Sequence, residues 1–174
     1  ISQGIQPIVG YNYGAQQFAR VKKALYIGAG MATFVSLLGY ITIGLFPHIV
    51  VRLFTDDASL IAMATTAIRT YFALLPVLGF TIIGANYFQA VGKPKQAVFL
   101  NLARQVFLLL PALLILPRYL QLMGVWMTAP VADGVASLIT AGAIYLEVRF
   151  LDKKESERQL SPYPDLRFAA SAKN

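Results

Sequence analysis

Asp133 is the residue whose type and position most suggest chemistry, because it is a lone carboxylate inside a long apolar run. It is the only charged side chain between Leu122 and Leu146. A charge at the centre of a membrane-spanning helix costs about 3 kcal/mol or more, so we expect Asp133 to face the bundle interior or a cavity, to be paired, or to be protonated. Ser137 and Thr140 follow at i+4 and i+7 on the same helical face. A polar stripe with a titratable centre is what a proton or cation relay needs, which makes Asp133 the candidate for ion coupling.

Arg104 is a second lone charge, inside the apolar run from Ala97 to Pro117. Two interpretations of it are open. A long basic side chain near the end of a span can snorkel to the membrane interface, which favours an interfacial anchor. The other interpretation is a role in binding lipid headgroups or in gating. Arg104 also supplies a structural alternative for Asp133, whose carboxylate would then be paired with this guanidinium or hydrogen-bonded to a neighbouring helix.

Neutral polar groups gather in the run from Thr70 to Val91. The candidates for substrate binding there are Tyr71, Asn86, Tyr87 and Gln89. Pro76 and Gly79 would let this helix bend, and Pro130 would loosen the run that holds Asp133 by removing a backbone hydrogen bond. Bent helices beside polar groups are common where transporters bind substrate. The alternative is that these groups only make hydrogen bonds between helices.

Long uncharged runs must position these groups. No Asp, Glu, Lys or Arg occurs from Ala24 to Val51 or from Thr70 to Gly92, and a helix needs ~20 residues to cross a bilayer core. Hydrophobic residues make up 57% of the 174-residue chain and charged residues only 13%, against the ~25% usual in soluble domains. The sequence therefore predicts an all-α, polytopic transmembrane helix bundle with about four full spans plus part of a fifth. The expected full spans are 24–46, 70–91, 97–116 and 122–146, after a partial helix at 1–17.

The charges predict how the bundle is organised and oriented. We expect a transmembrane region over residues 1–150 and a charged, disordered tail over residues 151–174. The chain begins without an initiator Met, and we interpret it as a fragment of a longer protein. Basic residues lie at the ends of alternate runs, namely Arg20, Lys22, Lys23, Lys93, Lys95 and several in the tail. By the positive-inside rule these positions, the tail included, face the cytoplasm.

Two local patterns predict details of the bundle. Gly28, Ala32 and Ser36 recur at four-residue spacing, which is typical of a face where helices pack closely. Thr55 or Asp56 is expected to cap a helix that begins near residue 58.

Several classes of function are excluded by composition. The chain has no cysteine and one histidine, so neither a disulfide nor a thiolate metal site is expected and no metal is predicted. The net charge of +7 lies at the ends of apolar runs and forms no continuous patch, which argues against nucleic acid as a partner. Neither a phosphate-binding loop nor a nucleophile with a base is present, and the glycines follow no strand. We therefore expect a protein that is not an enzyme and has no cofactor.

A family resemblance rests on one decapeptide and three shorter motifs. The stretch QPIVGYNYGA at residues 6–15 resembles the QP-x-x-G-x-N-x-G-A motif of the multidrug and toxic compound extrusion (MATE) transporters. The Pro76-x-x-Gly79 pattern, QAVGKP at residues 89–94 and LFTDD at residues 53–57 also look like that family. Order and spacing agree over about residues 1–150.

The resemblance implies a fold and an activity. The family has twelve transmembrane helices in two lobes, and this chain looks like most of the second lobe, with a first lobe missing. The family exports organic cations and other amphipathic drugs in exchange for protons or sodium, by alternating access. Pro7 and Gly10 would then lie where a helix flexes, and Gln6, Asn12 and Tyr13 where polar groups meet substrate. Some branches place an acid for sodium in the helix that matches 70–91, which has none here, so protons are the favoured ion.

The resemblance also implies a setting, and two other functions stay open. We expect a multi-pass protein of the plasma membrane, the inner membrane of a bacterium, with a cytoplasmic C-terminus. Its partners would be the bilayer, the first lobe and small-molecule drugs, and a proton or sodium gradient would drive it. The alternatives are a flippase for lipid-linked oligosaccharides from a related superfamily and a membrane scaffold that transports nothing.

Overall fold

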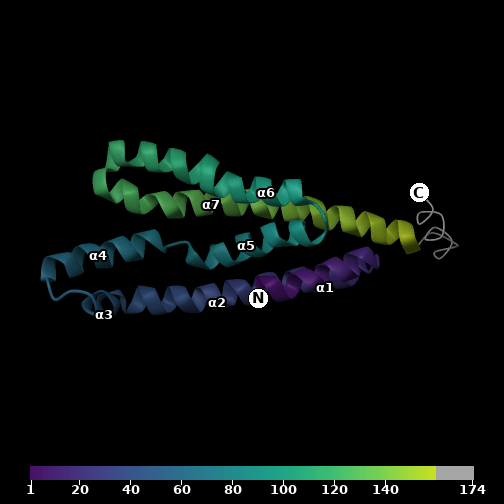
Figure 1. Cartoon of the computed structure of the whole chain (residues 1–174), viewed down its shortest axis with the longest axis horizontal. Helices are drawn as coiled ribbons and strands as arrows, with labels where there is room; N and C mark the ends of the chain where they lie inside the picture. Colours follow the sequence, from purple (N-terminus) through teal and green to yellow (C-terminus); the bar gives the residue numbers. More distant parts are fainter. Residues whose placement is uncertain (160–174) are drawn as a thin grey trace.

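The chain folds into an elongated bundle of helices (Figure 1). The computed structural model describes residues 1–159, with side chains through residue 157, and each regular element in that range is a helix. The elements are α1 (Ser2–Gly14), α2 (Phe18–Leu45), α3 (Pro47–Arg52), α4 (Ala58–Tyr71), α5 (Leu75–Ala90), α6 (Pro94–Leu102), the π-helix η1 (Ala103–Leu109) and α7 (Leu110–Gln159). The all-helical fold predicted from the sequence is confirmed.

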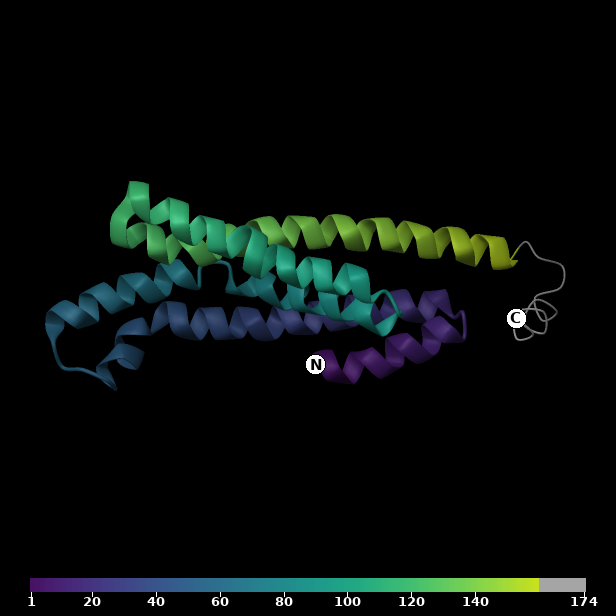
Figure 2. The ribbon, with the colours of Figure 1, turned by 45° about the horizontal axis from the view of Figure 1, so that its top comes forward.

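The connections lie at two opposite ends of the bundle. One end holds the α1–α2 turn, the α5–α6 turn and the last turns of α7 (Figures 1 and 2). We call it the basic end, because Arg20, Lys22, Lys23, Lys93 and Lys95 lie there. The opposite end holds α3, the α3–α4 connection and a reversal inside α7.

Local chemistry explains where several helices begin and end. Gly92 ends α5 with a φ of 74°, a left-handed conformation that glycine adopts without strain, and Pro94 begins α6 where its missing N–H is not needed. The cap of α4 is Asp57, whose carboxylate accepts hydrogen bonds from the backbone N–H groups of Ser59 and Leu60. The prediction of Thr55 or Asp56 was wrong by one or two positions, because Thr55 instead accepts from the N–H of Asp57.

The second predicted span is interrupted near its start and bent. Helices α4 and α5 are separated by residues 72–74 and meet at an angle of 43°. Pro76 is the second residue of α5. The helical path to the basic end therefore begins at residue 58 and includes a bend near its middle.

The third and fourth predicted spans are two limbs of one continuous helical stretch. Residues 94–157 form one helical, apolar stretch of 64 residues, which would be about 96 Å long if it were straight. The stretch reverses direction instead (Figure 2), at Gln121, whose φ of 51° and ψ of −131° lie outside the helical region. Gly124 permits the tight reversal, because a Cβ there would collide with the backbone of Leu116 and Pro117.

The membrane-crossing capacity of the helices follows from these paths. Phe18–Leu45 and the 94–157 stretch are long and apolar enough to cross a membrane, and the bent α4–α5 pair qualifies if it is counted as one span. Because the 94–157 stretch folds back on itself, its two limbs can each cross once. That arrangement accommodates four crossings, with α1 as a shorter helix beside α2.

Close packing of α5 against its neighbours holds the bundle together. At Gly79 a Cβ would lie 2.5 Å from the carbonyl oxygen of Ala32 and 2.7 Å from the Oγ of Ser36. At Gly84 the methyl of Thr140 occupies the space that a Cβ would need. Gly28 likewise lies against Ile5 of α1, so the predicted packing face of Gly28, Ala32 and Ser36 is confirmed.

Helix α7 continues well past the predicted end of the last span. Residues 151–159 are helical, not disordered as expected, and the rest of the expected tail, residues 160–174, lies outside the described residues. Two contacts explain the order. Leu151 is fully buried in the core cluster at the basic end, and the ammonium of Lys22 lies 2.5 Å from a carboxylate oxygen of Asp152 and 2.8 Å from one of Glu155.

Candidate functional site

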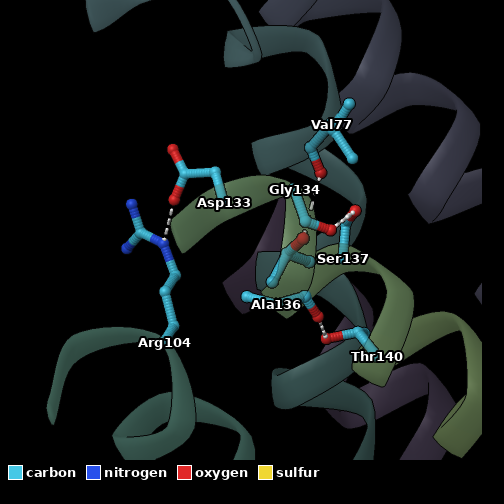
Figure 3. Close-up of polar contacts among 8 residues, drawn as sticks. Val77, Arg104, Asp133, Gly134, Ala136, Ser137 and Thr140 are labelled. Atoms are coloured by element: carbon cyan, nitrogen blue, oxygen red, sulfur yellow. Dashed lines mark hydrogen bonds and ion pairs between the residues drawn. The ribbon is translucent and has the colours of Figure 1, made fainter. Parts of the chain in front are cut away.

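Asp133 and Arg104 form an ion pair between the two limbs of the α6–α7 hairpin. The Nε of Arg104 donates to Oδ1 of Asp133 over 2.6 Å (Figure 3). The Asp133 side chain is 10% exposed and that of Arg104 is 26% exposed. In this conformation Asp133 is therefore paired with Arg104, which was the structural alternative to a role in ion coupling. Arg104 binds this carboxylate, whereas one expectation was that it anchors the chain at the membrane interface.

The rest of the predicted polar stripe is not connected to Asp133. The hydroxyl of Ser137 donates to the carbonyl of Gly134 over 2.7 Å, and that of Thr140 donates to the carbonyl of Ala136 over 2.9 Å. Figure 3 shows Asp133 turned toward Arg104 while these hydroxyls bond within their own helix. Ser and Thr commonly satisfy themselves in this way inside helices. A relay through the three side chains is absent from this conformation.

The backbone beneath Arg104 is unusual. Arg104 is the second residue of η1, a seven-residue π-helix. A π-helical turn inserts extra residues into an α-helix and is frequent at functional sites. The pair is joined by one Nε–Oδ1 hydrogen bond, whereas an arginine and a carboxylate can form two parallel bonds. The contact is thus short and partly buried, with one hydrogen bond where two are possible.

A second polar cluster joins α1 to α5. The amide of Gln6 donates to Oδ1 of Asn86 over 3.3 Å, and the amide of Asn86 donates to the hydroxyl of Ser2. The cavity beside them, which Tyr87 also lines, has a volume of about 10 Å³. That is at the lower limit for one water molecule. Gln6 and Asn86 are thus brought together as predicted for one site, but in this conformation they satisfy each other.

The other predicted substrate-binding residues are spread along the bundle. Asn12 donates to the carbonyl of Ile8 in its own helix, and the Tyr13 ring packs edge-on against Phe18. Tyr71 and Gln89 are exposed. Tyr71 contacts the ring of Phe72 at the α4–α5 bend, far along the chain from α1. The described residues do not gather these side chains into one pocket.

The predicted helix-bending residues have varied surroundings. Pro7 lies inside α1 and Pro130 inside α7, and Pro76 follows the α4–α5 bend. Gly10 lets α1 approach α5 closely, because a Cβ there would lie 3.1 Å from the carbonyl oxygen of Ala90. Together with Gly79, it contributes close helix packing that sequence reasoning had assigned to flexibility.

Sequence reasoning missed Glu147 as a site residue. Its side chain is 7% exposed, and its Oε2 lies 2.5 Å from the ammonium of Lys93 in the α5–α6 turn. The same ammonium lies 4.8 Å from the centre of the Phe150 ring. The sequence pattern that indicates it is the spacing of Glu147 and Leu151. The two lie one helical turn apart, so both fall on the face of α7 that Leu151 buries. Among residues 1–157, no three potential ligands cluster in a way that could hold a metal ion.

Comparison with known proteins identifies the family. The sequence model of the MatE family matches residues 1–114, about two thirds of the 174-residue chain. The chain belongs to this family. Its members are transporters and not enzymes.

Individual relatives agree with the family assignment. A solved structure of the MATE multidrug transporter DinF-BH superposes with a TM-score of 0.80 at 38% identity, over 86% of this chain and 34% of that one. The "Multidrug export protein MepA" of Staphylococcus aureus (strain N315) is 28% identical over 149 residues, which are 84% of this chain and 32% of the relative. A "FAD transporter" of Shewanella oneidensis is 29% identical over 111 residues, which are 64% of this chain and 25% of the relative. The chain therefore spans about a third of the length of such relatives.

Proposed function

We propose that this chain forms most of one lobe, the second, of a twelve-helix transporter that exports organic cations or amphipathic drugs. The observation that carries the proposal is the family match over residues 1–114, together with the superposition on a multidrug transporter at 38% identity. The first lobe would be supplied by another part of the same polypeptide. The proposal extends what the relatives are named for to this chain.

Alternating access by rocking of two lobes is supported by the fold comparison. The chain superposes on an inward-facing MATE structure with a TM-score of 0.81 and on an outward-facing one with 0.80, each at 22% identity. One lobe therefore resembles both conformations equally well. A lobe that moves as a nearly rigid body would give this result.

We assign ion coupling to Asp133 through exchange of its partner. While Arg104 holds the carboxylate, the two charges compensate each other and the pair is partly buried. When the lobes move, a proton or Na⁺ would replace the guanidinium, and the π-helix η1 gives the backbone of Arg104 a place to shift. A proton is the favoured ion, because α5 carries no acid. The gradient of that ion would be the energy source, with no cofactor.

Substrate would meet the polar groups of α1 and α5. Gln6 and Asn86 bond to each other here, and we propose that substrate replaces these bonds in the state in which Asp133 is paired with Arg104. The proposed set is completed by residues that are spread along the bundle in this conformation, namely Asn12 and Tyr13 of α1, Tyr71 at the end of α4, and Tyr87 and Gln89 of α5. Aromatic rings bind organic cations through their faces, which suits the proposed substrate class.

The orientation follows from the basic end. Arg20, Lys22, Lys23, Lys93 and Lys95 lie together there, beside the last turns of α7. We therefore propose a multi-pass protein of the bacterial inner membrane with this end and the C-terminus in the cytoplasm.

Dye uptake into inverted membrane vesicles tests the function. The complete transporter would be assayed with a cationic dye under an imposed pH gradient, as wild type, Asp133→Asn and Asp56→Asn. Asp56 is an exposed acid in the α3–α4 connection and serves as the matched control. Gradient-driven uptake in the wild type and control, lost in Asp133→Asn at equal membrane insertion, is the expected result. Uptake kept in Asp133→Asn would overturn the coupling role, and no uptake in any protein would count against export of that dye class.

A further inference from the structure

A groove lies between α1 and α2 at the basic end, and Asn12 is the one residue of the proposed substrate set that lines it. It has a volume of about 540 Å³ and is lined mainly by aliphatic side chains of the two helices. Ile5 and Ile8 come from α1, and Ile27 and Met31 come from α2. Its floor is closed where Gly28 lets the Ile5 side chain approach α2.

Two cations without acid partners line the same groove. Arg20 and Lys23 are exposed, and neither makes an ion pair with an acid among the described side chains. Lys22, between them in sequence, is instead neutralised by Asp152 and Glu155 of α7. The neutralised cation faces the bundle, and the two that keep their charge lie at the groove.

The length of the groove matches one leaflet of a bilayer. Its α2 lining runs from Arg20 to Met31, which at 1.5 Å per residue is about 16 Å. The hydrocarbon core of a bilayer is about 30 Å thick, so the groove extends from the interface to about the midplane. An acyl chain in the adjacent leaflet has the same extent, and its headgroup would lie at the level of the two cations.

We propose that this groove binds one anionic phospholipid of the adjacent leaflet. The phosphate would lie against Arg20 and Lys23, and one acyl chain would lie along Ile8, Ile27 and Met31. Charge complementarity favours an anionic lipid, because two cationic side chains without acid partners attract an anionic headgroup. The same charges repel the cationic drugs of the proposed function. The groove is built from residues of α1 and α2 and the adjoining Ile1, and the proposed lipid contacts do not use Asn12.

Lipid retention tests the headgroup contact. The complete protein would be extracted from nanodiscs of equal phosphatidylglycerol and phosphatidylcholine, and retained lipid would be counted by native mass spectrometry. The Arg20→Gln/Lys23→Gln variant is compared with Lys95→Gln, which removes an exposed cation of α6 outside the groove. We expect the preference for phosphatidylglycerol to fall roughly fivefold per groove cation removed and to persist in Lys95→Gln. An equal preference in all three proteins would overturn the proposal.

Cross-linking tests the position of the acyl chain. Phosphatidylglycerol with a photoreactive acyl chain would be cross-linked in nanodiscs and the labelled peptides mapped. Ile27→Trp fills the groove, and Leu138→Trp places the same side chain at a residue of α7 that is 73% exposed. We expect labelling of residues 1–31 that falls in Ile27→Trp and persists in Leu138→Trp. Labelling spread evenly over the helices, or unchanged in Ile27→Trp, would mean general attraction to anionic lipid and would overturn the site.

Discussion

The carboxylate of Glu147 lies 2.5 Å from the ammonium of Lys93, and this ion pair fastens α7 to the turn between α5 and α6. Glu147 is nearly buried and Lys93 is one quarter exposed. Breaking such a pair costs more than removing it whole, because one charge is left buried without a partner. This contact therefore ties α7 to α5 and α6 at the basic end, beside the apolar packing of that end.

Removing Lys93 alone should destabilise the protein more than removing both charges. We expect Lys93→Met to lower the free energy of unfolding by about 3 kcal/mol, the cost of leaving a buried carboxylate unpaired. Lys93→Met/Glu147→Gln should recover much of that loss. Equilibrium unfolding in mixed micelles measures both. The Glu147→Gln variant completes the cycle. If the loss of unfolding free energy in the double variant equals the sum of the losses in Lys93→Met and Glu147→Gln, the two side chains are not coupled.

Adding one methyl group at Gly79 should disturb the contact between α5 and α2. A Cβ there would meet the carbonyl of Ala32, so Gly79→Ala should cost about 1–3 kcal/mol through overpacking. Gly142 is also within a helix but has no atom near its Cβ position. Gly142→Ala should be neutral or stabilising by up to about 1 kcal/mol. The same unfolding assay separates them, and equal effects of the two changes would contradict the packing described.

The ordered end of α7 should depend on Lys22 and not on Lys23. Lys22 bridges α2 to Asp152 and Glu155, whereas Lys23 has no such partner among the described side chains. We expect Lys22→Gln to increase amide hydrogen exchange over residues 150–157, and Lys23→Gln to leave it unchanged. Exchange that is slow in both variants would show that the burial of Leu151 alone orders this segment.

The start of α4 should loosen in acid. Hydrogen bonds from Ser59, by its hydroxyl and its backbone N–H, and from the N–H of Leu60 lower the pKa of Asp57 below its usual value. A lowered pKa in the folded state means that the stabilisation is complete above pH ~4 and is lost as pH falls through the folded value. Amide exchange at Ser59 and Leu60 should therefore rise, relative to the intrinsic rate, below pH ~4. Asp57→Asn, which caps without titrating, should remove this dependence, and a dependence that persists in it would assign the effect to another group.

The apolar runs determine most of the fold, and contacts between distant residues determine the rest. Gly92 and Pro94 marked the α5–α6 turn correctly because both act through local backbone preferences. The reversal at Gln121 lies between the predicted spans 97–116 and 122–146. The residue that turns the chain was not predicted, since glutamine seldom adopts positive φ. Likewise, nothing in the sequence around Arg104 predicts a π-helix.

The sequence identified the residues of the candidate site, but it did not predict which side chains contact one another. Depth in an apolar run identified Asp133, but its pairing with Arg104 was only one of several alternatives, because 29 residues separate them. Ser137 and Thr140 share a helical face with Asp133, yet their hydroxyls bond to nearby carbonyls, which periodicity alone does not reveal. Glu147 lies one residue past the predicted end of the last span, and the sequence does not predict its contact with Lys93, 54 positions away.

The exchange of partners at Asp133 is the central claim, and proton release on substrate binding tests it most directly. A cationic dye would be added to the purified complete transporter in weakly buffered detergent, and the protons released per dye bound would be measured for the wild type, Asp133→Asn and Asp56→Asn. The account predicts release from the wild type and Asp56→Asn as dye binding returns the carboxylate to Arg104, and no release from Asp133→Asn although it still binds dye. Equal release from all three proteins would contradict it.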